Sequence, residues 1–133
     1  MANLFTLSTG NITISAQPEY MEGESSPSDA QHVWMYHIRI KNKGKEAVQL
    51  LNRYWHITDG HGMVQEVRGP GVVGLQPVIL PGEDFSYTSS VNLTTNTGMM
   101  HGNYEFKTLD KEIFVSQIPV FSLDSAEAIR LAN

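Results

Sequence analysis

The sequence predicts a single all-β domain of seven or eight short strands, and three observations lead to that prediction. Apolar and polar residues alternate with period two in several segments, which is the pattern of half-buried strands. Turn residues separate these segments at short intervals, and the 133 residues include 11 glycines. Charged residues make up only 17% of the chain, against about 25% in an average globular protein. Such spacing is typical of a sandwich or a barrel, and the pattern alone does not separate the two.

The clearest strand lies between residues 34 and 41. Its even-numbered positions, from Trp34 to Ile40, are large and apolar, whereas His37, Arg39 and Lys41 fall on the opposite face. Other strands are predicted from similar patterns at 11–16, 63–67, 78–80, 84–93, around 104–106 and at 113–123. The aromatic residues at these spacings are expected in the core rather than on a stacking surface; they are Trp34, Trp55, Tyr87, Tyr104 and Phe106.

The segment 48–58 is apolar on both faces, which predicts a central strand covered at least in part on both sides. One face is predicted to hold Leu51, Trp55 and Ile57, and the other to hold Val48, Leu50 and Tyr54. The Asp59-Gly60 pair that follows predicts a tight hairpin turn.

Two features of the C-terminal part depend on single residues. Pro119 lies inside the last predicted strand, and because proline cannot donate to a ladder, it indicates an edge position or a bulge. Residues from Ser125 to Leu131 are predicted to form a short terminal helix, with Asp124 or Ser125 as its cap.

The composition excludes several classes of function. A formal net charge of −5 argues against bulk attraction to nucleic acid or to anionic lipid. The chain has no cysteine, so disulfides, thiolate nucleophiles and cysteine metal sites are excluded. No signal peptide is visible and no apolar run approaches the roughly 20 residues of a membrane helix. We therefore expect a cytoplasmic protein that does not insert into membranes.

Five sequence blocks resemble the ApaG family, and they occur in the family order from about Ile12 to Leu123. They read LLNRYWHITDG at 50–60, EVRGPGVVGLQP at 66–77, PGEDFSYTS at 81–89, GMMHGNY at 98–104 and IPVFSL at 118–123. The resemblance implies a two-sheet antiparallel sandwich of the fibronectin type III or immunoglobulin type. The whole chain, 1–133, is then one ApaG-like domain, with its core at about 12–123 and a short tail at 124–133.

The resemblance also carries functional expectations. Bacterial members of the family are linked to cobalt resistance and magnesium efflux under the name CorD. Related domains in eukaryotic F-box proteins and in a DNA polymerase delta-interacting protein resemble interaction modules. This chain departs from the family pattern at Leu75, where an acidic residue commonly precedes Gln-Pro, and at Ser90, where glycine commonly follows Thr-Ser.

The loop at 69–74 matches the G-x-G-x-x-G string of dinucleotide sites, but a helix must follow that string, and Pro77 and Pro81 interrupt the next turns. Two interpretations remain. The glycines allow a tight left-handed excursion between strands, with a positive φ expected at Gly71 or Gly74. Alternatively, the loop amides form an anion-binding nest beside Arg68, although Pro70 supplies no N–H. The candidate ligand-binding or partner-binding residues are Arg68, Gly69, Gly71, Val72, Val73 and Gly74, with Val72 and Val73 expected to be an exposed apolar pair.

A second candidate surface is the basic rim, defined as Arg39, Lys41, Lys43 and Lys45. These residues alternate along one strand into the following turn, so they are predicted to share a face. Their charge either steers an acidic partner or protects an edge strand from pairing with another sheet.

Catalytic and metal sites have little support in the sequence. The chain lacks a Gly-x-Ser-x-Gly nucleophile elbow, and its carboxylate pairs fall in turns. His56 and His61 flank Asp59, a spacing that is common by chance. We therefore predict no catalytic residue, no metal and no cofactor. The function expected is that of a non-enzymatic module that binds a protein partner, and the alternative is a binder of pyrophosphate or a nucleotide, with or without a divalent metal, at residues 69–74.

Overall fold

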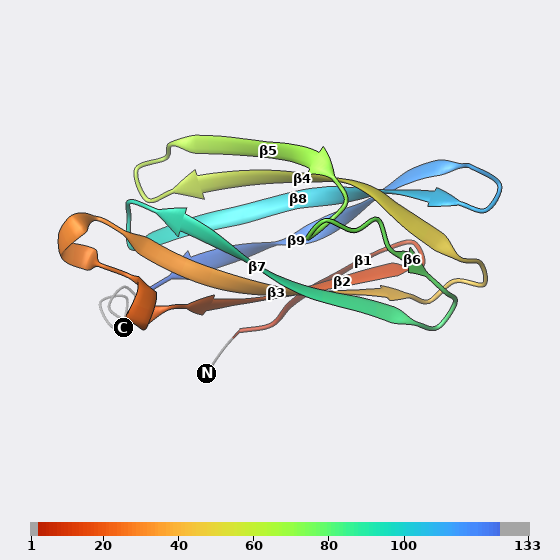
Figure 1. Ribbon diagram of the computed structural model, residues 1–133, viewed down its shortest axis with the longest axis horizontal. Coiled ribbons are helices and arrows are strands. Elements are labelled where there is room, and N and C mark those ends of the chain that lie inside the picture. Colours follow the sequence, from red (N-terminus) through yellow and green to blue (C-terminus); the bar gives the residue numbers. More distant parts are fainter. Residues whose placement is uncertain (1–2, 126–133) are drawn as a thin grey trace.

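The structure is a computed structural model that describes residues 3–125, and it consists of two facing antiparallel sheets (Figure 1). The four-stranded sheet has the order β1 (Phe5–Thr9), β2 (Ile12–Tyr20), β3 (His32–Asn42) and β7 (Asp84–Leu93). The second sheet has the order β5 (Val64–Pro70), β4 (Val48–Asp59), β8 (Thr97–Thr108) and β9 (Ile113–Asp124), and β6 (Val78–Ile79) pairs with β4 beside this path. Two single-turn helices, η1 (Glu22–Glu24) and η2 (Pro27–Asp29), connect β2 to β3.

The predicted sandwich is confirmed, and the described residues form nine strands rather than seven or eight. The additional element is β1, which pairs with β2, whereas the segment predicted at 78–80 forms the two-residue β6. No helix among the described residues is long and apolar enough to cross a membrane. The helix predicted from Ser125 to Leu131 lies outside the described residues apart from Ser125 itself.

The core lies between the sheets, and the predicted period-two pattern builds it. Trp34 and Ile38 of β3 are 1% exposed, and Tyr104 and Phe106 of β8 are fully buried. The five aromatic residues predicted to lie in the core are all buried there. Trp55 is 3% exposed and meets three aromatic rings edge-on, those of Tyr36, Tyr104 and Phe121. This central aromatic cluster joins the two sheets.

The prediction for the two faces of β4 is wrong, and a β-bulge is the reason. The register between β4 and β8 shifts between Leu50 and Asn52, so Leu51 has no partner on β8. One extra residue reverses the side-chain alternation along the rest of the strand. Val48 and Leu50 therefore lie in the same core as Trp55, whereas Leu51 does not.

Pro119 lies where its chemistry predicted. β9 is an edge strand of its sheet, and the register between β8 and β9 shifts between Met100 and Gly102, opposite the segment that contains Pro119. Gly102 permits close packing at this point, because a Cβ atom there would lie 1.9 Å from the carbonyl oxygen of Tyr54.

Candidate functional site

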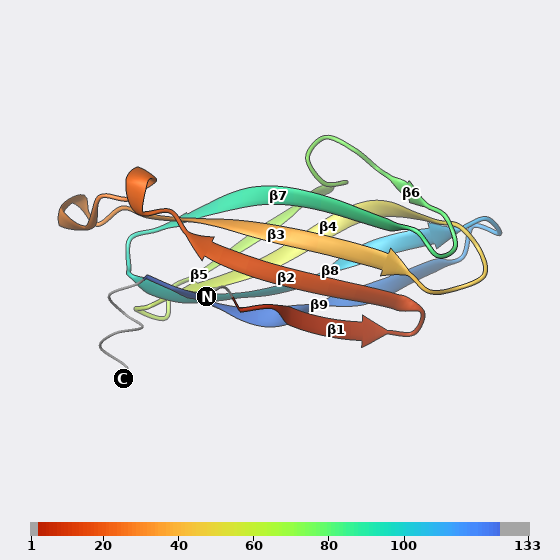
Figure 2. The same ribbon diagram turned by 90° about the horizontal axis from the view of Figure 1, so that it is seen from below.

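The connection between β5 and β6 forms an exposed hairpin that stands out from the sandwich (Figure 2). Val72 and Leu75 exchange two backbone hydrogen bonds, in which the nitrogen and oxygen atoms lie 2.8 and 2.9 Å apart. Between them, Val73 has φ of 44° and Gly74 has φ of 80°. Positive φ at both central residues is the signature of a type I′ turn. The left-handed excursion predicted for this loop is therefore confirmed, at Gly71 as well, where φ is 62°.

The bulge in β4 fastens this hairpin to the sandwich. The carbonyl oxygen of Leu51, the extra residue, accepts hydrogen bonds from the amide of Gly71 at 2.8 Å and from the side chain of Gln76 at 2.9 Å. Arg53 adds a second attachment, because its Nη1 donates to the carbonyl oxygens of Pro70 at 2.9 Å and Gly71 at 3.1 Å. Both ends of the hairpin are thus held by a single stretch of β4.

The glycines of the G-x-G-x-x-G string have structural roles here. A Cβ at Gly69 would lie 3.0 Å from the guanidinium of Arg53, which covers that position. A Cβ at Gly71 would lie 2.1 Å from the carbonyl oxygen of Leu75. Gly74 has open space around it but needs its positive φ for the turn. The string therefore encodes the attached hairpin, and the next element is the strand β6 rather than a helix.

The two valines of this loop do not form the exposed pair that the sequence predicted. Val72 is buried, at 1% exposure, because the hairpin folds its side chain into the core. Val73 is 56% exposed at the tip of the turn. A β-branched residue with positive φ is a conformational outlier, and such strain is found preferentially at functional sites.

Exposed apolar side chains continue beyond the tip. Leu75, Val78 and Leu80 are each at least half exposed, at 53%, 56% and 50%. We define these three residues and Val73 as the apolar hairpin surface. Four large apolar side chains exposed within eight residues make this segment a candidate contact surface.

Arg68 lies beside the hairpin on the outer face of β5. Its Cζ lies 4.6 Å from the centre of the Tyr54 ring, and its Nη2 lies 3.3 Å from a carboxylate oxygen of Glu66. The Tyr54 hydroxyl also donates to Glu66 at 2.8 Å, which lowers the pKa of Glu66 and raises the pKa of Tyr54. A hollow of about 430 Å³ adjoins this cluster, lined by Asn52, Arg53, Tyr54, Arg68, Gly69, Pro70, Asn103, Glu105 and Val115.

The loop amides offer few free donors to an anion. The N–H groups of Gly71, Val72 and Leu75 donate to carbonyl oxygens within the hairpin or on β4, and Pro70 has no N–H. The Arg68 side chain is 71% exposed and already meets the carboxylate of Glu66. The residues that the sequence named for a phosphate site are therefore neighbours, but the amides of Gly71 and Val72 and the guanidinium of Arg68 already have partners.

Arg53 is the residue of this site that sequence reasoning missed. It precedes Trp55 on the core face of β4, next to the buried Tyr36, Tyr87 and Tyr104. The hydroxyls of Tyr87 and Tyr104 are hydrogen-bonded to each other, and burial raises the pKa of both. The sequence did contain a signal for this role, because an arginine at a core-facing position of a strand needs hydrogen-bond partners inside the fold.

The edge-protection interpretation of the basic rim is wrong. β3 lies between β2 and β7 and is not an edge strand. Arg39 forms an ion pair with Asp84, which offsets part of its charge. Lys43 and Lys45 adjoin an open hollow of about 790 Å³ that is also lined by Glu46 and Glu112. One rim residue is thus ion-paired within the chain, and two others share a hollow with carboxylates.

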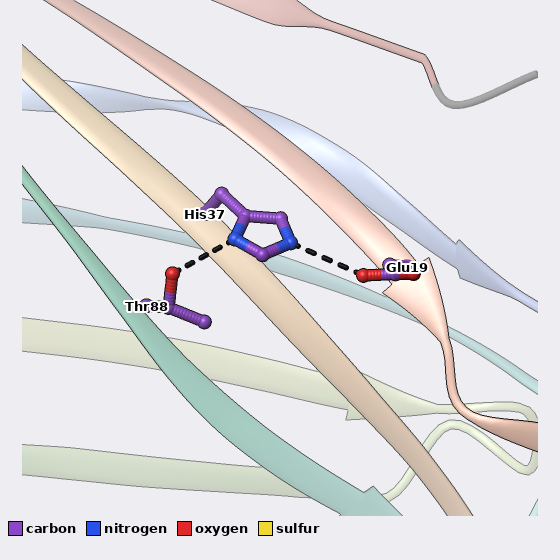
Figure 3. Close-up of polar contacts among 3 residues, drawn as sticks. All are labelled: Glu19, His37 and Thr88. Carbon is purple, nitrogen blue, oxygen red and sulfur yellow. Dashed lines mark hydrogen bonds and ion pairs between the residues drawn. The ribbon is translucent and has the colours of Figure 1, made fainter. Parts of the chain in front are cut away.

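A row of polar side chains that the sequence did not reveal crosses the outer face of the four-stranded sheet (Figure 3). The Nδ1 atom of His37 lies 2.8 Å from the hydroxyl of Thr88, and its Nε2 lies 3.2 Å from Glu19. With the proton on Nε2, the ring donates to Glu19 and accepts the Thr88 hydroxyl proton, which is the order found in nucleophilic sites. Here the side chains of His37 and Glu19 are 42% and 56% exposed, so water surrounds the row. A site of this kind works best where water is excluded.

The histidines near the β4–β5 turn do not assemble a ligand set. His56 stacks on His101 of β8, with ring centres 4.5 Å apart, and its Nδ1 is buried without a partner. Asp59 instead accepts hydrogen bonds from the amides of His61 and Met63 and so closes the predicted hairpin turn. Residues 3–125 contain no group of three or more histidine, aspartate or glutamate side chains that could hold a metal ion.

Comparisons with known proteins agree on one family. A family model described as the ApaG domain matches residues 22–108. The protein ApaG of Parvibaculum lavamentivorans is 50% identical over 98% of this chain and 100% of its own length. The chain belongs to the ApaG family. The protein ApaG of Rhodospirillum centenum is 52% identical over 88% of this chain and 90% of its own.

A solved crystal structure agrees with this fold. The crystal structure of the putative ApaA protein from Bordetella pertussis is 43% identical, covers 86% of this chain and 94% of its own, and has a TM-score of 0.85. The part of this chain that matches the ApaG domain model contains the apolar hairpin surface, Arg53, Arg68 and the basic rim. Both candidate surfaces therefore lie within the ApaG domain, whereas Glu19 lies before it.

Proposed function

We propose that this member of the ApaG family is a non-enzymatic binding module in the cytoplasm that binds a protein partner through the apolar hairpin surface. The resemblance to family members associated with cobalt resistance and magnesium efflux suggests that the partner acts in one of those processes. The observation that carries the proposal is Val73, a β-branched residue in a left-handed conformation with 56% of its surface in water. Asparagine or glycine fits such a position better, so retaining valine implies a use for its side chain.

The attachment of the hairpin supports the same proposal. Arg53, Gln76 and the bulged Leu51 fix the loop at both ends, so its tip is presented without a large loss of loop entropy on binding. Sandwich folds commonly present turns as binding surfaces, which is an argument by analogy of fold. The basic rim is the second surface considered, and it would steer an acidic partner.

Affinity capture from the source cells, at low and high salt, tests this proposal and separates the two surfaces. We expect Val73→Asn to remove the specific partner and the double variant Lys41→Glu/Lys43→Glu to keep it. Contact through the apolar surface should persist at high salt, whereas contact through the rim should weaken as ionic strength rises. Met63→Asn is the matched control, because Met63 is 69% exposed and directly precedes β5, at the opposite end of that strand from the hairpin.

The outcomes distinguish the possibilities. Loss of the partner in the rim variant alone would transfer the site to the basic rim. An unchanged set of recovered proteins in both variants would show that neither surface binds. Equal loss of the partner in Met63→Asn and Val73→Asn would indicate non-specific hydrophobic adsorption rather than a binding site.

A second candidate function, binding of pyrophosphate or a nucleotide with or without a divalent metal, is favoured by the hollow beside Arg68. This hollow places a guanidinium near the side-chain amides of Asn52 and Asn103, and all three groups can donate to phosphate oxygens. Against it stand Glu66, which contacts Arg68, and Glu105, which accepts a hydrogen bond from Asn52 at 2.7 Å.

Calorimetry with pyrophosphate and ATP, each with and without magnesium or cobalt, tests this second function. If it is correct, heat should be observed and Arg68→Ala should abolish it, while Arg39→Ala on the opposite sheet should not. No heat at millimolar ligand would remove this candidate. Binding that survives in Arg68→Ala would place the ligand elsewhere.

A further inference from the structure

β7 is a long edge strand whose free side carries little protection, since Asp84 is its only charged residue. It is the outermost strand of its sheet and pairs only with β3 among the described strands (Figure 2). Its ten residues contain no lysine, no proline and no bulge, which are the usual devices that prevent a sheet edge from pairing with another chain. The other edges differ: β1 lies against β9, where the amide of Gln117 donates to Thr9, and β5 carries Glu66 and Arg68 and ends at Pro70.

The backbone register identifies which groups face the free side. The amide of Asn42 donates to the carbonyl of Glu83, so even-numbered residues of β3 bond to odd-numbered residues of β7. The N–H and C=O groups of the even-numbered residues of β7 therefore point away from β3. These residues are all exposed and are Asp84, Ser86, Thr88, Ser90 and Asn92. They form a regular row of unpaired donors and acceptors.

This row reads nearly the same in both directions, with Thr88 at its centre. In an antiparallel pair with a second copy, Thr88 would lie opposite Thr88, Ser86 opposite Ser90, and Asp84 opposite Asn92. Hydroxyl pairs across strands are favourable, and the one charged residue meets an amide rather than another carboxylate. On the inner face the half-buried Phe85 would meet Val91 of the second copy.

We propose that β7 pairs with β7 of a second copy about a two-fold axis at Thr88, joining two four-stranded sheets into one of eight strands. Such an interface is isologous and closes after two copies. Each of the five even-numbered positions would exchange two backbone hydrogen bonds across the axis. The row in Figure 3 orients the side chain of Thr88 before the two copies meet. The Thr88 hydroxyl is hydrogen-bonded to His37, and His37 is hydrogen-bonded to Glu19.

The mass of the purified protein as a function of concentration tests this interface. Light scattering should show a shift from monomer to dimer between about 10 µM and about 1 mM, a range expected for a small, polar contact. The variant Ser86→Glu/Ser90→Glu places two carboxylates opposite each other twice in the dimer, and it should raise the dissociation constant by about tenfold or more. Ser86→Glu/Ser90→Lys places opposite charges there and should retain the dimer within about threefold.

Both variants change the same two exposed positions, so the difference between them reports on the register and not on folding. Amide exchange provides the second readout: the amides of Ser86, Thr88, Ser90 and Asn92 should exchange quickly in dilute protein and at least about tenfold more slowly in concentrated protein. A monomer at every concentration would overturn the proposal, as would a dimer that both variants leave unchanged. If these amides became protected only when a different protein is added, the strand that pairs with β7 would belong to that protein and not to a second copy, and the proposal would be wrong.

Discussion

Replacing Trp55 by alanine is expected to lower the free energy of unfolding by about 3–5 kcal/mol, the usual loss for a buried aromatic side chain. Trp55 is 3% exposed and packs edge-on against Tyr36 of the facing sheet and against Tyr104 and Phe121 of its own sheet, so its removal opens a cavity between the sheets. The midpoint of thermal unfolding should fall by on the order of 15 °C for a domain of this size. Denaturant unfolding of both proteins measures the change.

Trp55→Phe is the matched control for this prediction. It keeps an aromatic ring in the same place, so it should cost clearly less than the alanine variant. A loss below about 1 kcal/mol in Trp55→Ala would contradict the position of Trp55 between the sheets, because surface substitutions fall within that range.

Gly71→Ala is the second large effect expected, at about 2–5 kcal/mol. About 1–2 kcal/mol comes from the left-handed conformation at φ of 62°. A further loss of about 1–3 kcal/mol comes from overpacking, because the new Cβ would lie 2.1 Å from the carbonyl oxygen of Leu75. Movement of Leu75 would also disturb its two hydrogen bonds with Val72, whose side chain is part of the core.

Gly74→Ala separates the two contributions. Its φ of 80° is equally unsuited to alanine, but no atom lies within 4 Å of the Cβ position. It should therefore show only the conformational part of the loss, and equal losses in the two variants would contradict the close contact between Gly71 and Leu75. Chemical denaturation of the two variants side by side is the measurement.

The sequence was informative wherever a strand alternates without interruption. The faces of β3 and β7 were predicted correctly, because side-chain direction in a regular strand follows from position alone. The same reasoning failed in β4, because the single extra residue at Leu51 reverses the alternation and leaves no mark in the pattern. Pro119 did leave a mark, since its missing N–H restricts where it can lie.

The candidate site was predicted in outline but not in detail. The glycines at 69, 71 and 74 indicated a left-handed loop, and the loop is there. The burial of Val72 depends on how that loop folds back, which no local pattern encodes. The role of Arg53 and the row of Glu19, His37 and Thr88 depend on the pairing of strands distant in sequence, so they became visible only with the register known.

The central claim, that the hairpin retains a strained valine for contact with a partner, is tested most directly by measuring stability and binding together in Val73→Asn. Asparagine tolerates the left-handed conformation, so we expect the free energy of unfolding to rise by about 1 kcal/mol. Loss of the apolar tip should at the same time weaken binding of the partner recovered by affinity capture by about tenfold, as for removal of an apolar contact residue. A variant that is more stable and binds as tightly as the original protein would contradict the account.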